Sequence, residues 1–322
     1  MSDRMFGALH KEFPDIQKGV LLKKYTTFNI GGPAEYFLPA TTQAEILRSI
    51  AVARELSIPI FIMGGGSNLL VSDQGVKGLV VKNQVAEPMV LRQHTVVEAP
   101  AGVTLGTLVD FSIENSLEGL EWAGGLPGTF GGAVRGNAGA FGGEIKDSVL
   151  QVTALDDSYN LREFSNAECQ FSYRSSLFKE KNWVVLSALL QLKKGERAKL
   201  REIADSRIAY RKEKHPLEYP NAGSVFKNVD FKKVPPQFQE RFYDKVKQDP
   251  FPIVPSAWFI IEAGLTGTTV GQAQISKKHS NYIVNLGGAR ADDVVNLMRL
   301  TQECVKEAFN IELEPEIQLL GF

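Results

Sequence analysis

The chain has 322 residues, 43% of them hydrophobic, with 36 Lys and Arg against 37 Asp and Glu. At roughly 100 to 200 residues per domain, this length predicts two or three domains. The formal net charge of −1 gives no global basic field of the kind that draws proteins to nucleic acid or to an acidic membrane. We therefore expect neither nucleic acid nor a membrane as a partner, with a local basic cleft as the open alternative. No feature of the sequence implies an obligate protein partner, which leaves small molecules as the expected ligands.

Cysteine and histidine usage argues against a metal or disulfide framework. Cys169 and Cys304 lie far apart with no CxxC spacing, so they form neither a disulfide scaffold nor a cysteine-based zinc site. The four histidines show no HExxH or HxH spacing and are His10, His94, His215 and His279. The chain also has no apolar stretch of signal-peptide or membrane-span length. These features predict a metal-free protein of the reducing cytoplasm.

The first part of the chain alternates helix and strand patterns. Thr42 and Glu45 have the spacing of a capping box and predict a helix over residues 42–57. Strands are expected at residues 58–63, 78–82 and 96–100, and a helical pattern runs through Leu105, Leu108, Val109 and Ile113. The first of these strands leads directly into a run of three glycines. This order indicates a mixed α/β architecture.

The second part continues the mixture. Residues 184–192 predict a central strand and residues 196–212 a helix, after which prolines at 216 and 220 break the chain. We expect a new domain to begin near residues 221–228. It carries apolar runs near Ile260, Ile275 and Ile283, a helix over about 292–309, and a final half-buried strand with Ile311, Leu313, Ile317 and Leu319 in alternation around Pro315.

Glycine is concentrated in residues 119–143, which hold ten of the chain's 29 glycines. Such crowding suits a backbone that needs positive φ repeatedly or one that lies hard against a flat or anionic ligand. A flexible linker is the alternative, but linkers are rich in Ser and charge. Here Leu126, Pro127, Phe130 and Phe141 interleave the glycines, so we favour a structured ligand-binding segment.

The Gly64-Gly65-Gly66-Ser67-Asn68 run resembles a loop whose successive N–H groups bind an anion. It is not a Walker A loop, because no Gly-Lys-Ser/Thr follows. It is not a Rossmann fingerprint either, because Leu69 stands where the third glycine is needed. A purely structural hairpin remains the alternative for three glycines alone.

Polar candidates lie mostly in the second half of the chain. Ser224 is not a nucleophile elbow, because the GxSxG pattern fails at Phe226. It is otherwise typical of a turn residue, while Arg174 and Glu316 taken singly are typical of solvated surface charges. From the residues alone, the prediction stops at a nucleotide-sized ligand bound by Gly-rich backbone.

Seven motifs in order resemble the UDP-N-acetylenolpyruvoylglucosamine reductase (MurB) family. They are residues 27–32 (TFNIGG), 64–70 (GGGSNLL), 125–134 (GLPGTFGGAV), 136–144 (GNAGAFGGE), 173–175 (YRS), 221–228 (NAGSVFKN) and 313–317 (LEPEI). The resemblance spans almost the whole chain. It implies a mixed α+β protein with a non-Rossmann, two-part FAD-binding fold at residues 1–85 and 86–213, and an α+β substrate-binding domain at 214–322 whose last strand, 311–320, returns toward the flavin.

The resemblance also implies the cofactor and its contacts. FAD would be bound noncovalently, with NADPH as co-substrate, and hydride would pass from NADPH to the flavin and on to the enolpyruvyl group to give UDP-N-acetylmuramate. The residues that match the family's cofactor-binding loops are Gly64, Gly65, Gly66, Ser67, Asn68, Leu69, Gly125, Pro127, Gly128, Thr129, Gly132, Asn137 and Ala138.

By the same resemblance, Arg174 and Glu316 would activate the enol ether carboxylate, and Ser224 would be the proton donor. A neighbouring cation would stabilise the serine alkoxide, and Lys214 and Lys227 are the candidates. The positions that match substrate contacts are Tyr173, Lys214, Asn228 and His279, with Asn281 in the same stretch as His279.

The chain departs from the family pattern at three places. Arg135-Gly136 replaces a bulkier pair, Thr266 stands where some members have a substrate-binding Lys, and the short interval from Arg174 to Ser224 matches the subclass without a substrate-capping loop. Two other functions remain open: an FAD-dependent oxidase of the same fold, and a non-catalytic nucleotide-binding module.

Overall fold

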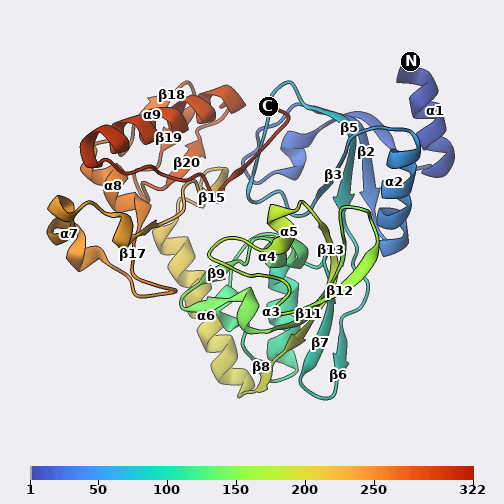
Figure 1. The fold of residues 1–322 in the computed structure, drawn as a ribbon, viewed down its shortest axis with the longest axis horizontal. Helices are drawn as coiled ribbons and strands as arrows, with labels where there is room; N and C mark the ends of the chain where they lie inside the picture. Colours follow the sequence, from blue (N-terminus) through green and yellow to red (C-terminus); the bar gives the residue numbers. More distant parts are fainter. Residues whose placement is uncertain (1) are drawn as a thin grey trace. The chain divides into compact units, whose positions relative to one another are not determined.

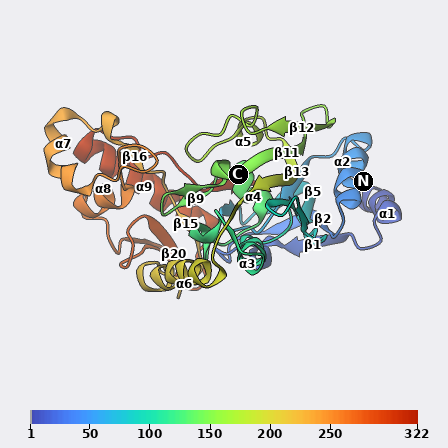
Figure 2. The same ribbon diagram turned by 90° about the horizontal axis from the view of Figure 1, so that it is seen from below.

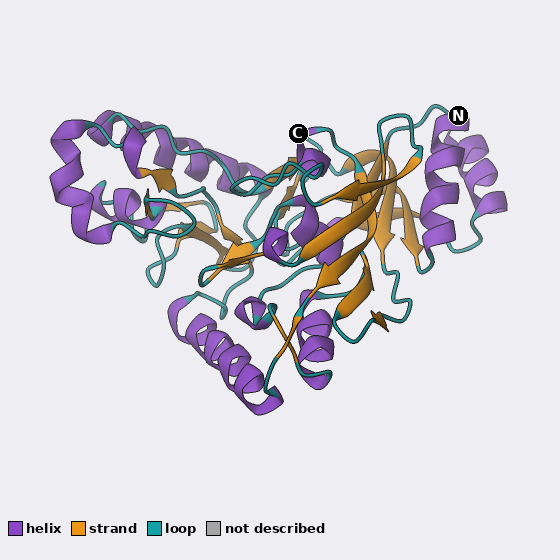
Figure 3. Cartoon of the chain, turned by 60° about the horizontal axis from the view of Figure 1, so that its bottom comes forward, coloured by secondary structure: helices purple, strands orange, loops and turns teal. Residues whose placement is uncertain are grey.

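The computed structural model describes residues 2–322, with side chains from residue 4 onward. The helices are α1 Ser2–Glu12, α2 Gln43–Glu55, α3 Leu105–Glu114, α4 Phe130–Arg135, α5 Leu177–Glu180, α6 Arg197–Lys214, α7 Pro236–Phe242, α8 Ser256–Glu262 and α9 Ala291–Phe309. Helix, strand and loop are interspersed along the whole chain (Figure 3).

The strands differ in length: the longest have seven or eight residues, and the others are shorter. They are β1 Gln17–Leu21, β2 Pro33–Ala40, β3 Ile60–Met63, β4 Leu69–Val71, β5 Val76–Asn83, β6 Val90–Arg92, β7 Val96–Pro100, β8 Leu117–Glu118, β9 Gly139–Ala140, β10 Gly143–Glu144, β11 Val149–Leu155, β12 Leu161–Ser165, β13 Val184–Gln191, β14 Lys193–Lys194, β15 Asn221–Ser224, β16 Val229–Asp230, β17 Ile253–Val254, β18 Thr269–Val270, β19 Ala273–Ile275, β20 Tyr282–Asn285 and β21 Gln318–Leu320.

The described residues divide into two compact units that are discontinuous in sequence. The first contains residues 2–20, 34–65 and 77–210, and the second contains residues 21–33, 66–76 and 211–322. Two short N-terminal segments therefore belong to the C-terminal unit, and the second of them begins inside the glycine run, between Gly65 and Gly66. The three-domain boundaries expected from the sequence stay a prediction.

The first unit contains two sheets with separate cores. One has the strand order β1-β2-β5-β3, with β3 and β5 parallel, and α1 and α2 pack on it through a core that includes Leu9, Tyr36 and Ile50; both helices lie beside it in Figure 1. The other is antiparallel with the order β12-β11-β13-β7-β6. Its core includes residues of α3 and α4, such as Leu108 and Phe130.

The second unit is built on the small sheet β15-β20-β19-β18. Helix α9 contacts β18 and β19 and lies beside α8 (Figure 2). Its core also contains Phe28, Ile30 and Leu70 from the two N-terminal segments. Asn285 helps to hold these segments, because its side-chain amide donates to the Phe28 carbonyl at 3.1 Å.

Most elements expected from the sequence are present. The capping box at Thr42 and Glu45 forms at the start of α2. Strands β3, β5, β7 and β13 occupy the expected runs, as do α3, α6 and α9. In β13 the inward positions Ala188 and Leu190 are buried, as expected for a central strand.

The expected final strand is only partly correct. Ile311, Leu313 and Ile317 are buried as the alternation predicted, but Leu319 is 48% exposed. Regular strand is confined to β21, which begins after Pro315. Proline lacks the N–H that a continuous ladder needs, so the segment before β21 contacts its neighbour only by an isolated bridge between Pro315 and Phe226.

Candidate active site

Two glycine-rich loops lie against each other in the first unit. A Cβ on Gly65 would lie 2.7 Å from the Cα of Gly128, and a Cβ on Gly64 would lie 2.2 Å from the Thr129 hydroxyl oxygen. Side chains at either position would force the loops apart, because real Cβ contacts are not this short. The close approach joins two of the segments expected to bind the cofactor into one glycine-lined surface.

Glycines within residues 119–143 are explained by different physical causes. A Cβ on Gly131 would lie 2.6 Å from that of Ala101, and one on Gly124 would lie 2.5 Å from the Ala204 carbonyl oxygen. These glycines are required by packing inside the protein. Gly132 is exposed on α4, and a Cβ there would meet only Thr129 Oγ1, at 3.5 Å.

Of the glycines at positions 124, 131 and 132, Gly132 is therefore the one whose presence packing does not explain. Helix interiors favour alanine over glycine, yet neither backbone conformation nor the nearest described atom requires glycine at this position. A flat ligand lying directly on the exposed side of α4 would require it. The exposed Gly125 and Pro127 extend the same accessible backbone, so the residues present fit the cofactor expected from the sequence.

Asn137 and Ala138 support this surface from inside. Asn137 is fully buried, and its amide donates to the Ser172 carbonyl at 3.0 Å while its side-chain oxygen accepts the Lys146 N–H at 3.1 Å. The Ala138 N–H donates to the Ala133 carbonyl. Asn137 thus links the glycine-rich segment to the loop that carries Tyr173 and Arg174.

Arg174 is held at a tight turn of the first unit. Ser172 and Ser175 exchange backbone hydrogen bonds, and Arg174 between them has φ 57°. Its guanidinium donates to the Gly139 carbonyl at 2.9 Å and lies 5.0 Å from the centre of the Tyr173 ring. The turn therefore presents a half-buried cation in a fixed orientation.

Gly66, the last glycine of the 64–66 run, and the residues that follow it belong to the second unit. Gly66 has φ 65°, and a Cβ there would lie 2.0 Å from the Tyr25 carbonyl oxygen. The Asn68 amide donates to the Glu316 carbonyl at 3.1 Å. The chain then enters β4 at Leu69, and β4 pairs in parallel with β21. Ser67 and Asn68 are half-buried, so the loop is tied to the C-terminal segment at Glu316.

Ser224 and Glu316 lie close together in the second unit. The Glu316 N–H donates to the carbonyl of Val225, the residue after Ser224, at 2.8 Å. Ser224 ends β15, and its partner across the antiparallel pair is Tyr282 on β20. The Ser224 side chain lowers the pKa of this tyrosine, and the Glu316 charge raises it. Arg174 belongs to the first unit.

Tyr282 and His215 are the residues that the sequence reasoning missed. The Tyr282 hydroxyl lies 3.1 Å from His215 Nδ1. Burial raises the pKa of Tyr282 to about 12 against the lowering effect of the Arg211 charge, and the Glu316 charge also raises it. Burial lowers the pKa of His215 to about 4, assisted by His279, Arg211 and Lys278. In the sequence, their one distinguishing feature was proximity, of His215 to the 221–228 motif and of Tyr282 to His279. The strand register that pairs Ser224 with Tyr282 cannot be read from a single sequence.

The residues expected to bind substrate in the second unit have distinct surroundings. Asn228 accepts the Ser256 N–H at 3.3 Å through its side-chain oxygen, and exposed Lys214 pairs with Glu213 at 2.7 Å. His279 is half-buried, accepts the Asn281 N–H at Nδ1, and has its pKa lowered by burial. Both Asn281 side-chain groups bond the backbone of Phe226, so Asn281 is structural.

The two lysines proposed to stabilise a serine alkoxide are both engaged with acids. Lys227 hydrogen-bonds the Glu314 carboxylate, and Lys214 pairs with Glu213. Thr266, which stands at a position of departure from the family pattern, bonds the Ser280 hydroxyl at 2.8 Å. Tyr282 is the strand partner of Ser224.

Residues 4–322 contain no cluster of three or more His, Cys, Asp or Glu side chains able to hold a metal ion. Cys169 and Cys304 are free thiols. Burial raises the pKa of Cys169 to about 12, which keeps it a neutral thiol. Among residues 2–322, no helix has both the length and the apolar character needed to cross a bilayer.

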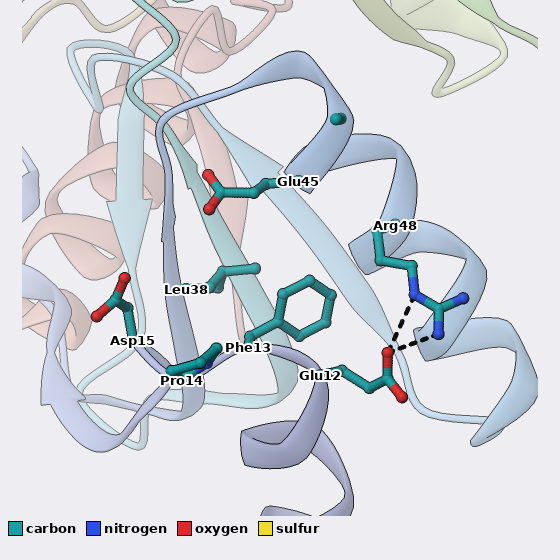
Figure 4. Close-up of a pocket in the computed structure, with 8 residues that line it drawn as sticks. Glu12, Phe13, Pro14, Asp15, Leu38, Glu45 and Arg48 are labelled. Carbon is teal, nitrogen blue, oxygen red and sulfur yellow. Dashed lines mark hydrogen bonds and ion pairs between the residues drawn. The ribbon is translucent and has the colours of Figure 1, made fainter.

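A surface pocket of the first unit lies beside α1 and α2 (Figure 4). It is lined by Glu12, Phe13, Pro14, Asp15, Leu38, Ala44, Glu45 and Arg48. Arg48 forms an ion pair with Glu12 at 2.5 Å, and Glu45 accepts the N–H groups of Thr41 and Thr42 in the helix cap. These polar groups serve the fold, and none of the expected site residues lines the pocket.

Comparison with known proteins matches two parts of the chain to family models. Residues 215–320 match the model of the "UDP-N-acetylenolpyruvoylglucosamine reductase, C-terminal domain", and residues 33–164 match that of an "FAD binding domain". A UDP-N-acetylenolpyruvoylglucosamine reductase of Caldanaerobacter subterraneus is 40% identical over 300 residues, which are 93% of this chain and 92% of the relative. The chain belongs to the UDP-N-acetylenolpyruvoylglucosamine reductase family.

Two further members show how completely the chain is covered. The reductase of Clostridium novyi is 35% identical over 321 residues, 100% of this chain and 96% of the relative. The crystal structure of MurB from Thermus caldophilus matches with a TM-score of 0.72 and 31% identity, covering 95% of this chain and 99% of that one. The resemblance to the family is confirmed, as are the mixed helix-and-sheet fold and the FAD-binding region.

Proposed function

We propose that this protein reduces UDP-N-acetylglucosamine enolpyruvate to UDP-N-acetylmuramate with FAD as its cofactor, a step of peptidoglycan precursor synthesis. The observation that carries the proposal is the 40% identity, across 93% of the chain, to a relative with that reductase name. The FAD-binding match at residues 33–164 supports the cofactor. NADPH is the proposed electron donor, so that NADPH, one proton and the enolpyruvyl substrate give NADP⁺ and the product.

FAD is held by the glycine-lined surface without a covalent bond. The proposed contacts are Gly64, Gly65, Gly66, Ser67, Asn68, Leu69, Gly125, Pro127, Gly128, Thr129, Gly132, Asn137 and Ala138. When bound, FAD supplies the hydride-transfer chemistry that the side chains lack. The accessible backbone at Gly125, Pro127 and Gly132 supports direct contact, whereas the buried amide of Asn137 supports a role in positioning the loop.

Arg174, Ser224 and Glu316 are the proposed catalytic residues. Arg174 and Glu316 act in the activation of the enol ether carboxylate, and the Arg174 cation stabilises negative charge that develops beside it. Ser224 donates a proton to carbon from its hydroxyl. The hydrogen bond from the Arg174 guanidinium to Gly139 and the backbone bond from Glu316 to Val225 support this assignment. The first fixes the orientation of a charged side chain, and the second holds the backbone that carries Glu316 beside the residue after Ser224.

Tyr173, Lys214, Asn228 and His279 are the proposed substrate contacts. Lys214 is exposed near Glu213, where a cation is accessible to the phosphates of a sugar nucleotide. The ring of Tyr173 lies under the Arg174 guanidinium. The enzyme is proposed to act in the cytoplasm on small molecules alone, an expectation supported by its free thiols.

One assay tests the function and its two alternatives. NADPH consumption is measured under nitrogen, with and without UDP-N-acetylglucosamine enolpyruvate, and the product is identified by mass spectrometry. The reductase requires the sugar nucleotide and is indifferent to oxygen. Oxygen-dependent consumption that ignores the sugar nucleotide would establish an oxidase, and binding without turnover would establish a nucleotide-binding module.

A further inference from the structure

Ser224, Tyr282 and His215 lie in succession across one face of the second unit. A register irregularity between Asn221 and Ser224 places Ser224 opposite Tyr282 in the β15–β20 pair. Directly opposed strand residues have side chains on the same face and close to each other. The Tyr282 hydroxyl in turn lies 3.1 Å from His215 Nδ1.

Burial is the main cause that keeps His215 and Tyr282 uncharged. The His215 ring centre lies 5.6 Å from that of His279 and 5.2 Å from that of Tyr282. Arg211 and Lys278 add positive charge around His215, Lys247 adds it around His279, and Glu316 adds negative charge near Tyr282. A cationic imidazole and an anionic phenolate are therefore both disfavoured at neutral pH.

Given the proposed function, we infer that Tyr282 and His215 form a proton relay that resupplies the Ser224 hydroxyl when Ser224 protonates the reduced substrate. The Ser224 proton goes to the substrate carbanion, the Tyr282 proton goes to Ser224 Oγ, and the His215 Nδ1 proton goes to Tyr282 Oη. His215 Nε2 takes up one proton from solvent. One proton enters from water, one C–H bond forms, and no protein group is left charged.

The relay removes the main difficulty of a serine donor. An alkoxide left in a partly buried site is costly unless it is paired or hydrogen-bonded. The two candidate lysines are engaged with Glu213 and Glu314. Tyr282 lies directly opposite Ser224, and half-buried His215 gives the relay an exit toward water. Tyr282 and His215 are thus positioning and relay residues that act through Ser224.

The relay fixes the tautomer of His215. For protons to move toward Ser224, His215 must carry its proton on Nδ1 and donate to Tyr282 Oη. Long-range ¹H–¹⁵N NMR of the FAD-loaded protein at pH 7, assigned with His215→Gln, reports which nitrogen is protonated. An Nδ1–H tautomer is expected. An Nε2–H tautomer, with Nδ1 accepting from Tyr282, would overturn the relay, because Tyr282 would then donate away from Ser224.

Half-reaction kinetics test the relay in the working enzyme. Tyr282→Phe and His215→Gln should leave flavin reduction by NADPH within about twofold and slow reoxidation by the enolpyruvyl substrate by about 10- to 100-fold, part of what a positioned donor supplies. Glutamine can donate a hydrogen bond to Tyr282 but cannot tautomerise. Tyr243→Phe, at a tyrosine 73% exposed in the same unit, is the matched control and should change neither step.

The outcomes separate the relay from the function beneath it. Wild-type enzyme that is reduced by NADPH but never reoxidised by the substrate would overturn the proposed function and the relay together. Normal wild-type reoxidation with unaffected variants would overturn the relay alone. If His215→Gln retained full reoxidation while Tyr282→Phe lost it, His215 would be excluded and the relay as proposed would be wrong.

Discussion

A serine hydroxyl is a weak acid, so its value as a proton donor depends on its immediate neighbours. Ser224 lies opposite Tyr282 and beside the segment that carries Glu316. The proposed donor therefore lies near the segment of Glu316. Gly223, which precedes it, has a positive φ of 80° and lies within the irregular register between Asn221 and Ser224.

The first prediction concerns the Ser224 hydroxyl. Ser224→Ala should leave flavin reduction by NADPH nearly unchanged and slow reoxidation by the enolpyruvyl substrate at least about a hundredfold, because only the second step needs the proton. Stopped-flow absorbance of each half-reaction measures this. Ser206→Ala, at an exposed serine on α6, is the control. If both steps slow together, or neither does, Ser224 is not the donor.

At the scale of elements, α4 carries two adjacent glycines with different constraints. Gly131 faces Ala101, where an added Cβ would lie 2.6 Å from another. Gly132 faces solvent with room for a methyl group. The fold therefore requires the first of these glycines, whereas we assign the second to contact with the ligand.

These neighbours give a matched pair of variants. Gly132→Ala should stabilise the FAD-free protein by up to about 1 kcal/mol through helix propensity, yet weaken FAD binding at least about tenfold by steric contact. Gly131→Ala should destabilise the fold by about 1 to 3 kcal/mol through overpacking. Denaturant unfolding and flavin fluorescence titration measure the two effects. Unchanged FAD affinity in Gly132→Ala would contradict a direct contact.

Local sequence patterns predicted helices and strands well where neighbouring residues determine the structure. The capping box at Thr42 and the acidic first turn of α9 correctly marked helix starts. The alternation of residues 311–319 predicted burial at Ile317 but not the loss of regular strand before β21. That loss depends on the neighbouring backbone with which the segment pairs. Around Pro315, this pairing is an isolated bridge to Phe226.

The residues of the site were harder to predict, because their contacts depend on how strands β15 and β20 pair. Motif resemblance supplied Ser224 and Glu316, and the structure brings their segments together. Tyr282 is 58 positions from Ser224 in sequence, and only the β15–β20 pairing shows that they are partners. His215 gave no signal of its own, since nothing in a single chain links it to the Tyr282 hydroxyl.

At the scale of the whole molecule, burial of His215 makes stability depend on pH. Its pKa is lowered from 6.5 to about 4, so between these values the unfolded chain binds more protons than the folded chain. The free energy of unfolding is therefore expected to fall as pH falls through this window. The lowered pKa of His279 acts in the same direction.

The expected loss at His215 between pH 7 and pH 5 is at most about 1 kcal/mol, because the half-exposed ring is partly screened by solvent. Denaturation midpoints at the two pH values measure it for wild type and for His215→Gln, which should show a smaller shift. His94→Gln, in the exposed turn between β6 and β7, is the control. An identical shift in wild type and His215→Gln would exclude His215 as the source.

The purified protein should be yellow with FAD bound noncovalently. Covalent flavin links need a nucleophilic side chain such as His or Cys beside the ring, and residues 64–71 and 119–143 contain neither. Acid precipitation should release all the flavin into the supernatant, where absorbance quantifies it. Colour that stays in the washed pellet would contradict noncovalent binding.

The last prediction concerns how one protein uses two large nucleotides. Beyond the glycine-rich segments assigned to FAD, the sequence offers no second dinucleotide fingerprint. NADPH and the sugar nucleotide are therefore expected to occupy one site in turn, with the reduced enzyme persisting between them. Initial-rate plots should give the parallel lines of a ping-pong mechanism, and excess NADPH should compete with the sugar nucleotide. Intersecting lines would require both nucleotides to be bound together and would rule out a shared site.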